Sequence, residues 1–166
     1  MTPGKAAVQR LQDYLSKQKS HDAGYQFSCD LKGLKIQINV KEFDKFSFIV
    51  ETLRIERSDD LQSGSDFLRK QADFLKSNLT YLLDNIEVFE IDSLQSKAQL
   101  RSRIPEENDS SLSYFEIMIE GRRGVALERV VFDKQKKQRK NATFHLTHET
   151  LTRTIDDFVK AIELTQ

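Results

Sequence analysis

The chain has little of the material on which several classes of protein depend. Its 166 residues include one cysteine, Cys29, which excludes an internal disulfide framework and favours a reducing compartment. Six Gly and two Pro leave little for loops that cradle phosphates. No apolar run approaches the roughly 20 residues that span a bilayer. Residues 1–5 lead into an amphipathic segment and not into an apolar signal core, so we expect a cytoplasmic protein without a membrane span.

What is present is enough for one folded domain. Hydrophobic residues make up 38% of the chain and include eleven Phe, and a chain of this length should bury about 70% of its unfolded surface. No internal repeat or long linker divides the sequence. We therefore expect a single domain over residues 1–166.

The charge is balanced in total but uneven along the chain. The 26 basic and 26 acidic side chains cancel. An acidic block (84–120) contains nine acidic and three basic residues, a net charge of −6, and a basic block (121–140) contains eight basic and two acidic residues, a net charge of +6. These blocks are either ordinary solvated surface or complementary surfaces of a symmetric homodimer, in which the acidic block of one copy meets the basic block of another.

Hydrophobic periodicity predicts an α+β protein. Helices are expected over 4–19, from a cap at Ser63 or Ser65 to about 84–85, and from a Thr147 cap to Ile162; strands are expected over 25–29, 34–40, 46–56, 86–91 and 142–146, and in a hairpin over 112–132. Strands joined by tight turns form antiparallel sheet. We expect about six to seven strands, with the N-terminal, middle and C-terminal helices packed mainly on one face. This order resembles that of small dimeric secretion chaperones, which are typically strongly acidic, whereas this chain is neutral.

Two strand segments carry further detail. The apolar pattern of 46–56 changes phase, which indicates a central strand or a bulge. In the hairpin over 112–132, a three-residue loop with Gly124 in the left-handed conformation costs less than a two-residue turn with both arginines at positive φ. This register puts one apolar set on a common face: Phe115, Ile117, Ile119, Val125, Leu127 and Val131. Arg129 then points toward the apolar face, opposite Ile117.

The other face of this hairpin mixes carboxylates with apolar side chains. Its candidate partner-binding residues are Glu116, Met118, Glu120, Glu128, Val130 and Phe132, and Ala126 shares the same face. A face that is half apolar is unusual for simple solvent exposure. It is either covered by a helix or receives a partner.

A basic run between the last two predicted strands is a candidate phosphate-contact loop. It contains Lys134, Lys136, Lys137, Arg139 and Lys140, which would release counterions from a nucleic-acid backbone on binding. No aromatic residue interleaves the run to stack on bases. Arg122 and Arg123 lie about 26 Å away along the strand, so they cannot extend it into one patch. A solvated hairpin loop is the competing interpretation.

Signals for catalysis or metal binding are weak. His145, His148 and Glu149 are close in sequence, but one imidazole lies on a strand and the other follows a helix cap, so their rings need not converge. Cys29 alternates with aromatic residues and is interpreted as a small buried hydrophobe. We predict no catalytic residue, no cofactor and no metal site.

Arg129 is the candidate anion anchor. A guanidinium aimed at an apolar face either extends to the sheet edge or pairs with a buried carboxylate. In a pocket between sheet and helices, with His145 nearby, it would bind an anionic ligand.

These observations favour a non-catalytic cytoplasmic protein-interaction module, homodimeric through charge-complementary sheet surfaces. One alternative is a nucleic-acid-binding accessory protein that uses the basic run 134–140. A second is a ligand-binding protein or enzyme with a pocket near Arg129.

Overall fold

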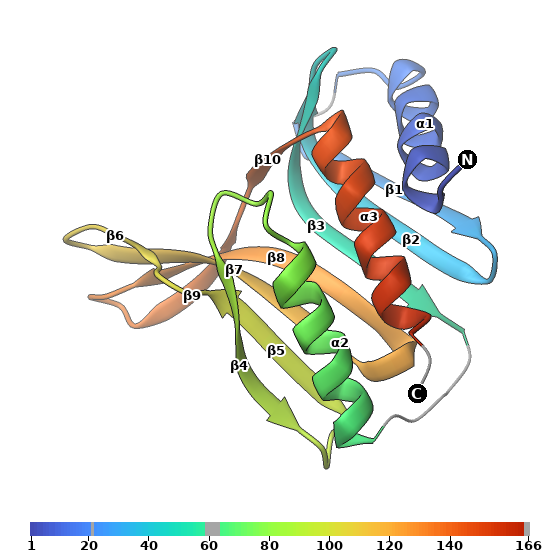
Figure 1. The fold of residues 1–166 in the computed structure, drawn as a ribbon. Coiled ribbons are helices and arrows are strands. Elements are labelled where there is room, and N and C mark those ends of the chain that lie inside the picture. The colour runs from blue at the N-terminus through green and yellow to red at the C-terminus, as the bar shows by residue number, and fades with distance from the viewer. Residues whose placement is uncertain (21, 59–63, 165–166) are drawn as a thin grey trace.

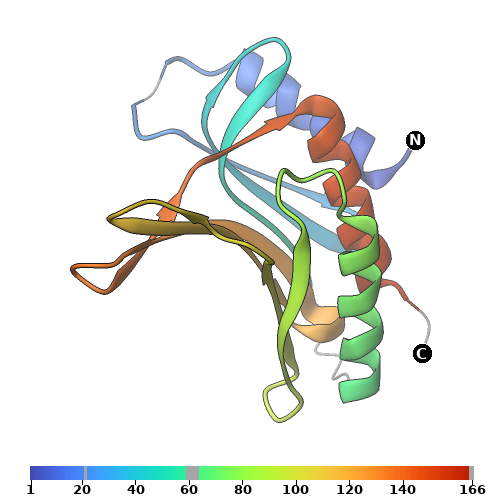
Figure 2. The same ribbon diagram turned by 60° about the vertical axis from the view of Figure 1, so that its left-hand side comes forward.

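A computed structural model describes residues 1–20, 22–58 and 64–164. Within them, three α-helices cover one face of an antiparallel sheet, and the opposite face carries no helix (Figures 1 and 2). We call this helix-free side the outer face. The predicted α+β class is confirmed. The sheet has ten strands and not six to seven, because segments 92–104, 105–111 and 134–142 contribute the short strands 97–102, 106–107 and 138–142, which the sequence pattern does not reveal.

The elements follow one another in an order close to the expected one. They are α1 (Pro3–Ser16), β1 (Tyr25–Leu31), β2 (Leu34–Phe43), β3 (Ser47–Arg57), α2 (Ser65–Asn78), β4 (Ile86–Asp92), β5 (Lys97–Ser102), β6 (Glu106–Glu107), β7 (Ser111–Ile119), the 3-10 turn η1 (Gly121–Arg123), β8 (Gly124–Asp133), β9 (Gln138–Ala142), β10 (Phe144–Thr147) and α3 (His148–Ile162). The strand order is β1-β2-β3-β8-β7-β5-β4, and β10, β6 and β9 pair with β3, β7 and β8. One sheet therefore joins both halves of the chain.

The phase change in β3 is caused by a bulge. Pairing with β2 passes from Asn39–Thr52 to Val40–Val50, so the ladder skips Glu51. The extra residue lets Val50 and Leu53 both face the helices, where both are fully buried. Both explanations left open by the sequence apply, because β3 carries the bulge and is also a central strand between β2 and β8.

Helix α2 ends at Asn78 and not near residues 84–85, so that prediction is wrong. The Asn78 side chain donates to the carbonyl of Phe74 at 2.8 Å, a local bond that competes with continued helix. Leu79 and Leu82 are still buried, but in an irregular connection, whereas Leu83 is 95% exposed. Spacing alone cannot distinguish these cases.

The start of α2 also differs from the prediction. Its N-cap is Gly64, which makes no side-chain capping bond, and the proposed Ser63 cap lies outside the described residues. Helix α3 agrees with the prediction: Thr147 is the N-cap, and its Oγ1 accepts from the Thr150 amide at 3.1 Å.

The β7–β8 hairpin turns earlier than predicted. The Glu120 amide donates to the Gly124 carbonyl at 2.9 Å, which closes a three-residue loop over 121–123. The left-handed residue is Gly121, with φ of 59°, while Gly124 is extended at 169°. A Cβ on residue 124 would lie 2.6 Å from the Ile55 carbonyl, so glycine is required there by the close approach of β3.

This turn shifts the register by two residues and preserves the faces. Ile117 lies opposite Leu127, and Arg129 lies opposite Phe115. The predicted opposition of Ile117 and Arg129 is wrong, but each side chain points to the predicted side, because a two-residue shift keeps alternation in phase.

The sheet divides near its middle. The first part of β3 pairs with β10 and the second with β8, while the far part of β8 pairs with β9. The ends of β7 and β8 therefore leave the body together with β6 and β9 (Figures 1 and 2). We call this projection, residues 106–114 and 129–142, the arm.

Candidate functional site

The strand register arranges the outer-face side chains in rows. One row crosses β4, β5, β7 and β8 as Glu87, Arg101, Glu116 and Glu128. Neighbouring rows contribute mainly apolar groups. We call the outer-face set of these strands the outer patch: Phe89, Gln99, Arg101, Leu112, Tyr114, Glu116, Met118, Ala126, Glu128, Val130 and Phe132.

The centre of the outer patch is an arginine stacked between two aromatic rings. The Arg101 guanidinium lies 4.0 Å from the Phe89 ring centroid and 5.1 Å from that of Tyr114, a favourable cation–π geometry. Arg101 also pairs with Glu116 at 3.9 Å, and Arg139 from β9 contacts the same carboxylate. The sequence gives no sign of this cluster, because it comes from four strands.

Five predicted partner-face residues share the outer face, and Glu120 lies beyond the end of β7. Described helices do not cover them, yet Glu116 is 8% exposed and Val130 is fully buried. Glu116 contacts Gln99, Arg101 and Arg139, and the strands of this part of the sheet curve with the arm around the outer face (Figure 2). Phe89 remains 59% exposed.

The outer face of β1 and β2 has a different character. Its residues are polar: Gln26, Ser28, Asp30, Lys35, Gln37 and Asn39. Apolar surface on the outer face is therefore concentrated over β4, β5, β7 and β8. The outer face of β1 and β2 has the polar character of an ordinary solvent-exposed surface.

A polar hollow borders the patch at the other end of β8. It has a volume of about 230 Å³ and includes Arg54, Arg57 and Arg123 in its lining, together with Glu56 and Glu120. Arg54 pairs with Glu56 at 2.9 Å. The border of the outer patch near β3 is thus rich in arginine, whereas its border along β4 carries carboxylates.

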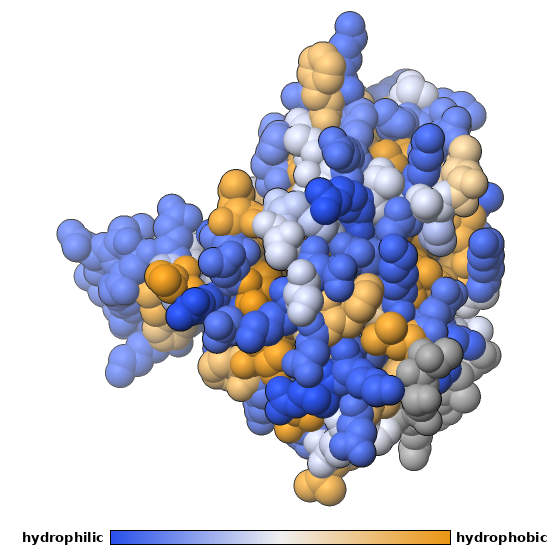
Figure 3. Space-filling view, viewed as in Figure 1, coloured by the Kyte–Doolittle hydropathy of each residue, from blue (hydrophilic) through white to orange (hydrophobic). Residues whose placement is uncertain are grey.

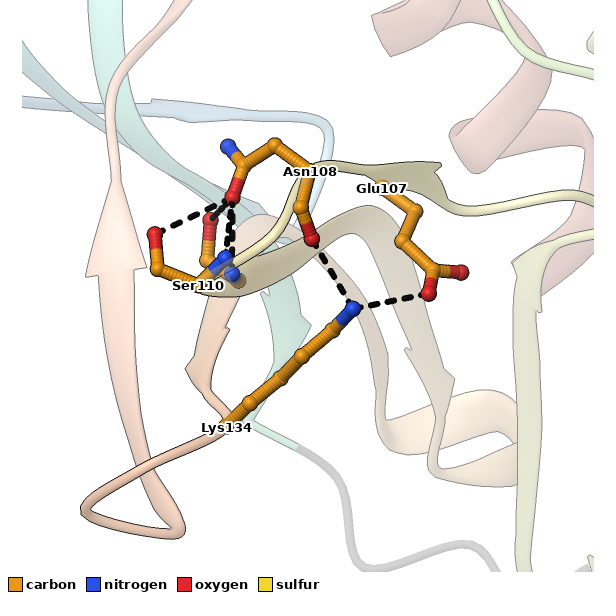
Figure 4. Close-up of polar contacts among 5 residues, drawn as sticks. Glu107, Asn108, Ser110 and Lys134 are labelled. Carbon is orange, nitrogen blue, oxygen red and sulfur yellow. Dashed lines mark hydrogen bonds and ion pairs between the residues drawn. The ribbon is translucent and has the colours of Figure 1, made fainter.

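The predicted basic loop is partly strand. Arg139 and Lys140 lie in β9, because this segment pairs with the far end of β8 as an antiparallel strand. At the turn, Lys134 Nζ donates to Glu107 Oε1 at 2.7 Å and to the Asn108 carbonyl at 2.8 Å (Figure 4). The Asn108 side chain in turn accepts from the Ser110 amide at 2.9 Å.

Four ion pairs between described residues join the acidic block to the basic block within one chain. They are Arg129–Asp84, Arg129–Glu106, Lys134–Glu107 and Arg139–Glu116. Part of the complementarity visible in the sequence is therefore intramolecular. Lys136, Lys137 and Lys140 remain exposed.

Arg129 points to the helix side, into a pocket of about 380 Å³. Its Nη1 lies 3.3 Å from Asp84 Oδ2 and its Nη2 lies 3.2 Å from Glu106 Oε2. The guanidinium also lies over the Phe115 ring, 4.7 Å from the centroid. His145 contributes to the pocket wall. Figure 3 shows hydrophobic side chains gathered where the arm joins the body, close to this pocket.

The carboxylates beside Arg129 are held differently. Ser102 Oγ donates to Asp84 Oδ2 at 2.7 Å and accepts from the Phe115 amide at 2.7 Å, so Asp84 is fixed from a buried serine. The Glu106 side chain is 80% exposed. Sequence reasoning did not find Asp84 or Ser102, because folding alone brings β5 beside β7 and the end of the α2 connection.

The two histidines are separate. His145 is exposed on β10, whereas His148 stacks on Phe48 with ring centroids 4.6 Å apart. In the described part of the chain, no three His, Cys, Asp or Glu side chains lie together as metal ligands would. Burial raises the pKa of the half-buried Cys29 thiol, the reverse of an activated nucleophile.

Comparison with family models, with curated proteins and with solved structures finds no match to the chain. The resemblance to secretion chaperones therefore stays one of element order. None of the helices within the described ranges has the length and apolar character needed to cross a membrane.

Proposed function

We propose that the chain is a non-catalytic protein-interaction module that binds a partner protein through the outer patch. The Phe89–Arg101–Tyr114 stack carries this proposal. Aromatic residues, Met and Arg are enriched at the centres of protein interfaces, and here they lie together on a sheet face without a described helix over it. The outer face of β1 and β2 is polar, so the apolar and aromatic character belongs to the outer patch and not to the whole outer face.

Charge around the outer patch defines the partner more closely. Glu87, Glu90 and Asp92 line the β4 side, while the hollow at the β3 side contains three arginines and two glutamates, a net charge of +1. Complementary potentials favour specific association. The expected partner surface is apolar at its centre, basic over β4 and acidic over β3.

Site-specific photo-crosslinking tests this function. A photoreactive residue placed at Met118, in the outer patch, should give an adduct with a specific protein in cells. The same residue at Gln37, on the outer face of β2, is the matched control and should give none. Equal adducts from both positions, or no adduct from Met118, would contradict the proposal.

A charge reversal tests the orientation of the partner. Glu90→Lys should reduce the Met118 adduct, because it opposes the basic part of the partner surface. Asp30→Lys makes the same change on the outer face of β1 and should leave the adduct unchanged. If both substitutions changed the Met118 adduct equally, the proposed orientation of the partner would be wrong.

The nucleic-acid alternative has less support. Glu106, Glu107, Asp109 and Asp133 lie on or beside the arm that carries the five basic residues. A phosphate backbone would therefore meet acidic groups among the basic ones.

A further inference from the structure

The pocket beside Arg129 lies on the helix side of the sheet, apart from the outer patch. Its volume of about 380 Å³ falls in the range of small-molecule sites, roughly 300–1,000 Å³. Phe115 and Phe144 form part of its lining, with T-shaped rings whose centroids are 5.6 Å apart. Leu82 and Leu146 add buried apolar surface. The pocket therefore suits an apolar body about the size of a substituted aromatic ring.

The charges at one side of the pocket do not cancel. Asp84 and Glu106 flank Arg129, so the three ionised groups carry a net charge of −1. Arg129 is held by Oδ2 of one carboxylate and Oε2 of the other. Among the described residues, no hydrogen bond reaches Asp84 Oδ1 or Glu106 Oε1, and both atoms can accept from a ligand.

We infer that this pocket binds a small ligand with an ammonium group on an apolar, preferably aromatic, body. The ammonium brings the net charge of the group to zero and donates to the two carboxylates, while the body packs on Phe115 and Phe144. Arg129 is a positioning residue that orients both carboxylates. An anionic ligand would have to displace one of them from Arg129, because the guanidinium already serves two.

Ligands that share one aromatic body and differ in charge test this inference. The probes are 2-phenylethylamine, 2-phenylethanol and 3-phenylpropionate, each titrated into the full chain and followed by backbone amide NMR shifts. The amine should perturb Phe115, Arg129 and Phe144 and should bind ~1.5- to 5-fold more tightly than the alcohol, the range expected for one partly exposed charge pair. The carboxylate should bind most weakly.

Two neighbouring glutamates provide matched variants. Glu106→Gln removes the net negative charge, so the affinity of the amine should fall to that of the alcohol; the side chain is 80% exposed, and folding should be preserved. Glu107→Gln removes a carboxylate that contacts Lys134 and should leave amine binding unchanged. Tighter binding of 3-phenylpropionate, equal binding of all three probes, absence of binding, or equal loss in both variants would each overturn the inference. Crosslinking from Met118 is independent of these outcomes.

Discussion

Gln71 shows how one buried polar side chain joins three parts of the fold. It lies on α2 and is fully buried. Its Nε2 donates to the Gly121 carbonyl at 2.9 Å and to the Ala161 carbonyl at 3.0 Å. The side chain thus ties α2 to the β7–β8 turn and to the last turn of α3.

Gln71→Ala should destabilise the protein by roughly 2–4 kcal/mol, because two buried carbonyls lose their donor and a cavity remains. Urea denaturation followed by circular dichroism measures the change. Lys70→Ala, at the neighbouring exposed position, should stay within about 0.5 kcal/mol. Changes of similar size in both variants would show that the two hydrogen bonds of Gln71 do not contribute to stability.

The importance of Gln71 could have been suspected from sequence. It falls three residues after Leu68 and four before Leu75, on the same face as the apolar stripe. A polar residue in such a stripe signals a buried hydrogen bond. Its partners could not be named, because Gly121 and Ala161 are distant in sequence.

Two turns depend on aspartate side chains. Asp44 Oδ1 accepts from the Phe46 amide at 2.7 Å, and Asp133 Oδ1 accepts from the Gln135 and Lys136 amides at 2.9 and 3.0 Å. Backbone hydrogen bonds are the main cause of the lowered pKa of both carboxyls. These bonds favour the charged form, so they contribute to stability above the ordinary aspartate pKa.

Acid should loosen these turns before the core. The contribution is lost as the pH falls through the lowered pKa, that is, below about pH 4. Hydrogen exchange, corrected for its intrinsic pH dependence, should then accelerate at Gln135 and Lys136. Asp133→Asn retains an accepting oxygen without the charge and should remove this pH dependence at its own turn. The same dependence in that variant would contradict the assignment.

At the scale of elements, prediction succeeds where the determinants are local. Helix α3 follows from the Thr147 cap and its stripe, and the faces of β7 and β8 follow from alternation. The end of α2 does not, because burial of Leu79 and Leu82 imitates a continued helix. Strand β9 is missed because its basic side chains have no strand pattern and its pairing comes from β8.

For the molecule as a whole, the charge-complementary homodimer stays a prediction. Four intramolecular ion pairs use part of the complementarity, and the exposed Lys136, Lys137 and Lys140 are left to contact a second copy. Sedimentation velocity at micromolar concentration should then show a dimer at ~50 mM salt that dissociates at ~500 mM, where salt screens the attraction between charges strongly. A monomer at both salt concentrations would remove the homodimer.

One part of the candidate site can be predicted from the sequence, and another part cannot. Shared faces, such as that of Met118 and Val130, follow from alternation along one hairpin. The Phe89–Arg101–Tyr114 stack depends on the β4–β5 register and on a bulge between Val88 and Glu90. That register is set by contacts between distant strands, and no local pattern encodes it.

The divided pairing of β3 has a consequence for synthesis on the ribosome. One side of β3 can pair with β2 as soon as both have emerged, but its other side waits for β8 and for β10, residues 144–147. Until residues 144–147 have been translated, the first part of β3 (47–50) is an open edge, and open edges recruit strands from other chains. A nascent chain that stalls before residue 144 is therefore exposed to aggregation that the finished protein avoids.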